Sequence, residues 1–223
     1  MRPSLALSVL VLFAVACSSK PVETSARGKA LPVDHPAMDN AKLSSSAQTQ
    51  RLSLAQLRGA LPVVMGKDAA GNPITWMTPG GKPGLDAYSI TLGEADYVNS
   101  TEDDLSPGPL YLKFMNDAAR DVCDRALIAD QGRQSAGDRV LLHAVSFSDT
   151  TATNATGVAA NLRYLKLRFH GVKVADTDDT PIAGLQTLFT QVVAATPVAK
   201  VPVKEGWRAV CVALLTSPEF HLY

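Results

Sequence analysis

Apolar residues recur at three- and four-residue spacing along most of the chain after residue 50. This period places them on one face of an α-helix, whereas the two-residue alternation typical of a half-buried strand is scarce. The strongest such face consists of Leu110, Phe114, Met115, Ala118, Val122, Cys123 and Ala126. Ser106 is the expected cap of this helix, with Pro107 in its first turn and its end near Ile128. The pattern predicts an all-α fold, a compact bundle of about five to six helices.

Other segments with helical spacing support the same fold class. A first helix should follow the N-cap residue Ser53, and Pro62 should kink or end its regular turn before Gly66 stops it. A second runs from Asn154 to Gly171, a third follows 179–181, and the last begins near Lys204 and ends at 217–218. Their expected core residues are Leu54, Leu57, Leu61, Val158, Leu162, Leu165, Phe169, Ile182, Leu185, Phe189, Val192, Val193, Trp207, Val210, Cys211, Leu214 and Leu215.

A stretch rich in glycine and proline follows the first helix, ahead of the helix expected from Ser106. Residues 67–84 contain several turn signals, and Trp76 lies between them. We expect an ordered loop pinned by Trp76, followed by a short helix around 85–92. Residues 51–223 would then form a single helical domain.

The first seventeen residues read as an export signal with a lipid attachment point. Arg2 is followed by an apolar run over 5–15, which is too short to cross a bilayer as a helix. Ala14-Val15-Ala16-Cys17 resembles the bacterial lipobox, in which the cysteine is diacylated and becomes the mature N-terminus. The competing interpretation is an ordinary secretory signal with a chance cysteine after it.

The lipobox interpretation divides the N-terminal part in two and predicts where the protein is located. Residues 1–16 become a signal peptide, and 17–50, which lack aromatic residues, become a lipidated, disordered and flexible tether. Ser18 follows Cys17, in place of the aspartate that retains many lipoproteins in the inner membrane. The expected location is therefore the cell envelope, on the periplasmic face of the outer membrane.

Assigning Cys17 to a lipid leaves two further thiols, those of Cys123 and Cys211. Export places both in an oxidising compartment, where a disulfide between them would stabilise the fold by roughly 4 to 5 kcal/mol in the chain-entropy model. Two separate buried thiols are the alternative.

Charge and histidine spacing restrict the ligand classes. The chain has 21 basic and 21 acidic residues, and removal of Arg2 with the signal leaves a net charge of −1, which gives no electrostatic case for nucleic acid. His35, His143, His170 and His221 have no partner at a helical metal-ligand spacing, so neither a metal nor a cofactor is expected.

The densest basic cluster consists of Arg163, Lys166, Arg168, His170 and Lys173. One hypothesis is a docking patch for an acidic partner or for lipid phosphate, which the tether would let it reach. The other is the solvated face of an amphipathic helix, with His170 placed to complement the helix dipole.

The end of the chain, Ala213-Leu214-Leu215-Thr216-Ser217-Pro218-Glu219-Phe220 and then His221-Leu222-Tyr223, carries a family resemblance. It resembles the "LL-small-SPxFLY" junction of the planctomycete-type cytochrome-c-associated domain family, whose domains are mostly of unknown function. Leu167-Arg168-Phe169-His170-Gly171 stands where that family has a basic segment, without its doubled arginine and proline. A C-x-x-C-H haem motif is missing from the sequence. The resemblance implies an envelope location and a helical fold.

Two functions follow as hypotheses. The first is a non-catalytic, lipid-anchored domain that binds another envelope protein, because no catalytic motif was found in the sequence. The alternative is an enzyme or an electron-transfer accessory of a cytochrome-associated envelope complex, which rests on the family resemblance.

Overall fold

The computed structural model describes residues 49–223, which form seven α-helices and three short 3-10 turns. The α-helices are α1 (Leu54–Met65), α2 (Gly84–Ala87), α3 (Pro109–Gln131), α4 (Ala155–His170), α5 (Ala183–Ala195), α6 (Pro202–Thr216) and α7 (Pro218–His221). This described part contains isolated β-bridges but no strand, so the predicted all-α fold is confirmed. The predicted signal peptide, Cys17 and the tether up to residue 48 lie outside the described residues.

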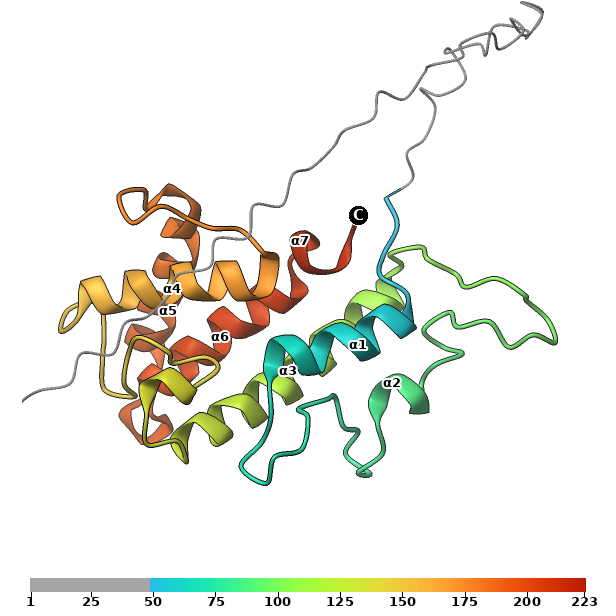
Figure 1. Ribbon diagram of the computed structural model, residues 1–223, viewed down its shortest axis with the longest axis horizontal. Helices are drawn as coiled ribbons and strands as arrows, with labels where there is room; N and C mark the ends of the chain where they lie inside the picture. Colours follow the sequence, from blue (N-terminus) through green and yellow to red (C-terminus); the bar gives the residue numbers. More distant parts are fainter. Residues whose placement is uncertain (1–48) are drawn as a thin grey trace, which may run out of the picture. The chain divides into compact units, whose positions relative to one another are not determined.

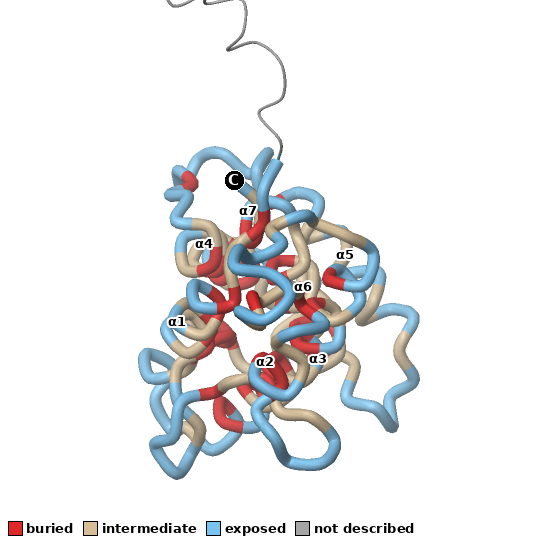
Figure 2. The backbone as a smooth tube through the Cα atoms, turned by 90° about the vertical axis from the view of Figure 1, so that its right-hand side faces the viewer, coloured by how far each residue is buried: buried red, intermediate tan, exposed pale blue. Residues whose placement is uncertain are grey.

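Helix α6 is the centre of the packing, because it contacts α3, α4 and α5 (Figure 1). Its buried face consists of Val203, Gly206, Trp207, Val210, Cys211, Leu214 and Leu215, which includes every residue predicted for it. Gly206 allows α5 to approach, since a Cβ there would meet the ring of Phe189 at 2.8 Å. Buried residues line the inner sides of the helices, and the connecting loops are mostly exposed (Figure 2).

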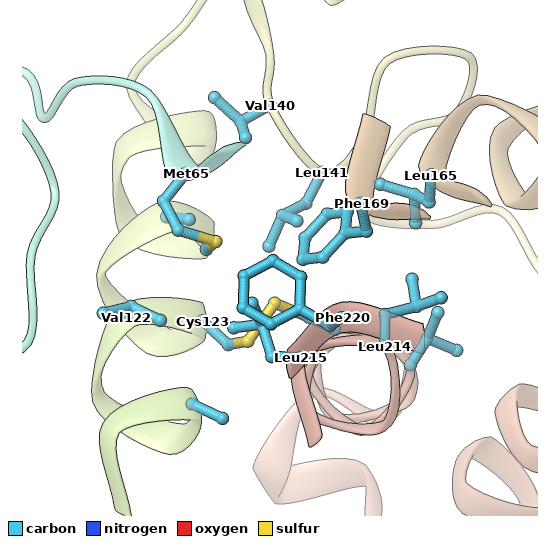
Figure 3. Packing of buried hydrophobic residues seen from close by; sticks show 14 of the residues in the cluster. Met65, Val122, Cys123, Val140, Leu141, Leu165, Phe169, Leu214, Leu215 and Phe220 are labelled. Carbon is cyan, nitrogen blue, oxygen red and sulfur yellow. A yellow bond between two sulfur atoms is a disulfide. The ribbon is translucent and has the colours of Figure 1, made fainter. Parts of the chain in front are cut away.

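A disulfide joins Cys123 of α3 to Cys211 of α6, with an S–S distance of 2.01 Å. Both cysteines are fully buried within the core. Around the bridge lie side chains from α1, α4, α6 and α7, among them Met65, Phe169 and Phe220 (Figure 3). The bond therefore joins two helices within one hydrophobic core, at cysteines 88 residues apart in the sequence.

Helix α1 begins as predicted and passes through its proline. Ser53 and Gln56 form a reciprocal capping box, and Gly66 ends the helix with φ of 72°. Of the two expectations for Pro62, an end or a kink, the helix does not end there, because it extends to Met65. Proline removes one backbone bond in the last turn, but buried Leu61 and Met65 on either side hold the turn against the core.

Helix α3 starts later than its sequence indicated. The cap is Gly108 with Pro109 in the first turn, in place of Ser106 and Pro107. Tyr111 is buried and Leu110 is exposed, so the predicted face is corrected by one residue at this end. Pro107 and Pro109 can each occupy the first turn of a helix, and the tertiary contacts of Tyr111 favour the start at Pro109.

The loop after α1 is ordered around Trp76, as predicted. Trp76 is buried, and the N–H of Gly84 donates to its carbonyl oxygen at 2.8 Å. A Cβ on Gly84 would lie 2.2 Å from the indole, so only glycine lets α2 begin against that ring. The short helix expected over 85–92 is confined to Gly84–Ala87, with turns following it.

Asp130 organises the apolar segment after α3. Its carboxylate is fully buried and accepts backbone N–H bonds from Val140 at 2.8 Å, Leu141 at 2.7 Å and Leu142 at 3.1 Å. Arg133 donates to the same carboxylate at 2.8 Å. One side chain thus satisfies three buried backbone donors that no helix or strand could pair.

Helix α4 matches its predicted limits, with Asn154 as N-cap and Gly171 in the left-handed region at its end. Before α5, however, neither Asp179 nor Thr180, the two caps that the sequence suggests, caps the helix; Asp179 precedes the 3-10 turn Thr180–Ile182 and makes no capping bond with its side chain. The side chain of Asp179 instead forms an ion pair with Arg163.

The two ends of the described chain are bonded to each other. Gln50 and Tyr223 exchange backbone hydrogen bonds at 3.1 and 2.9 Å, and Leu52 donates to the carbonyl of His221 at 2.8 Å. We call this pairing of 50–52 with 221–223 the terminal clasp (Figure 1). Among residues 49–223, no helix is long and apolar enough to cross a membrane.

Candidate functional site

The structure divides the predicted basic patch among different internal contacts. Arg163 pairs with Asp179, and Lys166 donates to His170 Nδ1 at 3.1 Å. Lys173 is exposed beyond the end of α4.

Arg168 has a structural role at the end of α1. Its Nε donates to the carbonyl of Val64 at 2.6 Å and its Nη2 to that of Val63 at 3.3 Å. The last carbonyl groups of a helix have no partner within that helix and carry its partial negative charge. Arg168 therefore ties α4 to the C-terminal end of α1.

His170 and Ser217 lie at the distance of a catalytic base and a nucleophile, with Nε2 and Oγ 3.0 Å apart. Nε2 also lies 3.0 Å from the carbonyl oxygen of Leu214, which can only accept a hydrogen bond. Lys166 donates to Nδ1, so the bonding pattern assigns the ring proton to Nε2. A ring that carries its proton on Nε2 cannot remove a proton from Ser217. The arrangement latches α4 to the end of α6.

The groove between the Trp76 loop, α2 and α3 has the composition of a binding site. We define the aromatic groove by the rings of Trp76, Tyr88 and Phe114 and the residues beside them, Met77, Thr78, Pro79, Lys113, Asp117, Arg120 and Asp121. Its volume is about 570 Å³, within the range of roughly 300–1,000 Å³ usual for ligand pockets.

The three rings of the groove contact one another. The centroids of Trp76 and Tyr88 lie 5.6 Å apart in a stacked pair, and Phe114 lies 4.7 Å from Tyr88 and 5.9 Å from Trp76. Trp76 is buried at the base, whereas Tyr88 and Phe114 are half-buried. The groove therefore offers two partly open rings on a rigid base.

The polar groups of the aromatic groove are bonded within the protein. Lys113 pairs with Asp117 at 2.7 Å, and the N–H of Met77 donates to Asp121 at 2.8 Å. Arg120 donates to Asn116 at 2.9 Å. With two carboxylates and two cations, the groove demands no counter-ion. Its chemistry suits an apolar side chain with polar groups around it.

No protein-family model, curated protein or solved structure matches the chain. The resemblance of 213–223 to the cytochrome-c-associated family thus stays a prediction from the sequence. In the structure this segment spans the end of α6, the Ser217-Pro218 break and α7, with Phe220 in the core.

Sequence reasoning missed the aromatic groove as a site. It identified Trp76 as a pin for the loop and Phe114 as a core residue of α3, but nothing in the sequence brings either one to Tyr88. The available signal was Trp76 itself, a large ring inside a stretch of turns with few apolar neighbours to bury it.

Proposed function

We propose that this chain is a lipid-anchored helical lipoprotein of the cell envelope whose domain binds a partner protein and does not catalyse a reaction. Cys17 would hold it at the periplasmic face of the outer membrane, and the partner would be another envelope protein. The anchor rests on the lipobox resemblance of 14–17. The binding role rests on one observation, the aromatic groove.

The aromatic groove supports binding of an apolar anchor from a protein partner. Tryptophan, tyrosine and arginine are enriched among residues that dominate binding energy, and rigid rings lose little conformational entropy on binding. The internal pairing of Lys113, Asp117, Arg120 and Asp121 leaves the rings as its main free contact surface. An extended segment carrying proline, leucine or an aromatic residue fits this chemistry.

Capture from detergent-solubilised envelopes tests the binding role. We expect the wild-type protein to capture a partner. Tyr88→Ala and Phe114→Leu should each bind that partner at least tenfold more weakly, which is the loss expected for a central contact residue. Ile128→Ser, which changes an exposed apolar residue of α3 outside the groove, is the matched control. Thermal unfolding of each variant separates lost binding from lost folding. Repeated recovery of the protein alone, or equal capture by Tyr88→Ala, would contradict the proposal.

The anchor has a separate test. We expect labelled palmitate to be incorporated into the wild-type protein and not into Cys17→Ser, and we expect the wild type to fractionate with outer membranes. Unlabelled wild-type protein in the soluble periplasmic fraction would favour the ordinary secretory signal. That result would leave the groove experiment unaffected.

A further inference from the structure

A buried histidine forms part of the terminal clasp. His221, the last residue of α7, is only 2% exposed, and its own carbonyl oxygen accepts the N–H of Leu52 at 2.8 Å. The imidazole ring and one of the clasp's hydrogen bonds therefore belong to the same residue. Histidine is also the side chain that ordinarily changes its charge between pH 5 and 8. A change of charge on this ring thus acts directly on the pairing of 50–52 with 221–223.

The surroundings of the imidazole favour its neutral form. Its Nδ1 has no hydrogen-bond partner among the described residues, and the ring of Tyr111 lies beside it with the two centroids 5.8 Å apart. Burial lowers the pKa of His221 below its ordinary value of 6.5, and the carbonyl oxygens of Ser217 and Leu215 offset this effect only in part. A buried charge is costly unless an opposite charge lies next to it.

The charged and titratable groups on α3 and on the neighbouring loop do not compensate a proton on this ring. Burial raises the pKa of Tyr111 to about 12, so the phenol stays neutral. Beside that phenol lies a fixed cation, the buried guanidinium of Arg51, 4.5 Å from the ring centroid. Asp104 accepts from the N–H of Ser106 at 2.9 Å, which lowers the pKa of its carboxyl. A proton on His221 would therefore add a second positive charge next to Tyr111.

The charged groups on α4 and α7 are engaged with one another. The pKa of Glu219 on α7 is lowered by its own backbone N–H and by the Ser217 hydroxyl, and to a smaller extent by His170 and Lys166 of α4. Lys166 donates to Nδ1 of His170, and Nε2 of this ring lies 3.0 Å from the Ser217 hydroxyl. His170 is therefore a second histidine whose charge could influence α7, and an experiment must separate its effect from that of His221.

Uptake of a proton and opening of the clasp favour each other. When the clasp opens and the ring of His221 reaches water, its pKa returns to about 6.5, whereas the pKa of the closed state is lower. The stability of the clasp is therefore fully present above about pH 7 and is lost as the pH falls. At pH 5.5 an open ring is protonated about ten times for each neutral one, so the open population can rise by up to about tenfold.

The opening should remain local to the chain ends. Phe220, the neighbour of His221, points into the core beside the disulfide of α3 and α6, and this contact holds the rest of α7 (Figure 3). The clasp itself depends on the backbone bonds that Gln50 exchanges with Tyr223 and on the bond from Leu52. A few bonds at an edge open at a lower free energy than a buried core does.

We propose that His221 makes the terminal clasp an acid-sensitive latch. In mild acid a proton from solvent adds to the unpartnered ring nitrogen, the pairing of 50–52 with 221–223 opens, and the disulfide-linked core stays folded. Opening releases residues 50–52 from the edge of the domain. The latch uses none of the residues of the aromatic groove and does not depend on that groove's role.

Hydrogen–deuterium exchange of the protein as isolated from cells, in a neutral detergent, tests the latch. Labelling times are scaled to the intrinsic exchange rate at each pH, and mass spectrometry follows peptides that cover 49–53 and 219–223. We expect the protection of these peptides to fall about three- to tenfold from pH 7.5 to pH 5.5. Peptides from α3 and α6 should keep their protection.

Two variants remove the titratable ring in different ways. His221→Phe keeps an aromatic contact with Tyr111, and His221→Gln keeps a polar side chain, so one of them serves if the other does not fold. In each, the protection of the clasp should change by less than about twofold between the two pH values. Each variant is compared with itself, and a general loss of stability therefore does not imitate the result.

His143→Gln is the matched control, because His143 is half-buried and stacked on Tyr164, 4.3 Å away between centroids, outside the clasp. It should respond to pH as the wild type does, and so should His170→Gln. Unchanged protection of the wild type, a response retained in the His221 variants, or a response lost in His170→Gln would each overturn the proposal. Equal loss of protection in α3 and α6 would mean global unfolding and overturn it as well.

Discussion

Replacing Asp130 by asparagine should destabilise the protein more than any other single change of charge in the described residues. One carboxylate oxygen accepts from Val140 and Arg133, and the other accepts from Leu141 and Leu142. An asparagine keeps one accepting oxygen and turns the other position into a donor. Whichever way the amide lies, two of the four donors lose their acceptor and face an N–H group.

The size of the effect follows from this count. A buried donor without a partner costs about 1–3 kcal/mol, so two of them cost roughly 2–6 kcal/mol. The amide will turn its donor toward Arg133, which reaches water, and this orientation places the expected loss near 3 kcal/mol. Against a total stability of about 5–15 kcal/mol, such a loss is large enough to measure without abolishing folding.

Urea unfolding of the oxidised protein, followed by tryptophan fluorescence, measures the change in unfolding free energy. Asp138→Asn is the control, because the exposed carboxylate of Asp138 accepts no hydrogen bond from the described residues. This substitution should change the unfolding free energy by less than about 0.5 kcal/mol. A loss below about 1 kcal/mol for Asp130→Asn would refute the reasoning that these bonds hold the 140–142 segment.

Three further changes have defined outcomes. Gly84→Ala places a Cβ 2.2 Å from a buried ring and should cost about 1–3 kcal/mol in unfolding free energy, whereas Gly59→Ala, with open space around it, should stabilise α1 by roughly 0.5–1 kcal/mol. Burial raises the pKa of Tyr111 to about 12. Between about pH 10 and pH 12 the folded state therefore keeps a proton that the unfolded state loses, and the unfolding free energy should fall as the pH rises. Tyr111→Phe should reduce the difference between the unfolding free energies measured at pH 9 and pH 11. The double replacement of Cys123 and Cys211 by alanine should lower the unfolding free energy by about 4–5 kcal/mol. Equal urea midpoints for the wild type and the double variant would contradict a stabilising bridge.

Helix faces and helix ends were predictable because both are local. The spacing of Val158, Leu162 and Leu165 identifies the buried side of α4, and Asn154 and Gly171 mark its ends through hydrogen bonds made within a few residues. Such signals operate before any tertiary contact forms.

The errors arise where a distant contact decides a local choice. Ser106-Pro107 and Gly108-Pro109 are both acceptable helix starts, and the burial of Tyr111 between Arg51 and His221 selects the later one. Asp130 lies just past the helix end expected near Ile128, and nothing in the neighbouring sequence indicates that the structure buries it completely.

The candidate sites were less predictable than the fold. The basic cluster of α4 stood out because its members are neighbours in sequence, but neighbouring positions on a helix face different elements, and the contacts of Arg163 and Arg168 are internal. The aromatic groove joins residues 76, 88 and 114, which are far apart in the sequence. Proximity of that kind exists only after the helices have packed.

The terminal clasp sets how the domain would respond to mechanical tension. A pull on the chain ahead of Gln50 enters the protein through the backbone hydrogen bonds to Tyr223 and His221, before it reaches any helix. Next in the chain is Arg51, whose side chain donates to the carbonyl oxygens of Leu52, Leu92, Asp104 and Ser106 and so ties the clasp to segment 92–106. A pull from this side therefore acts on the bonds of the terminal clasp before it acts on the disulfide-linked pair of α3 and α6.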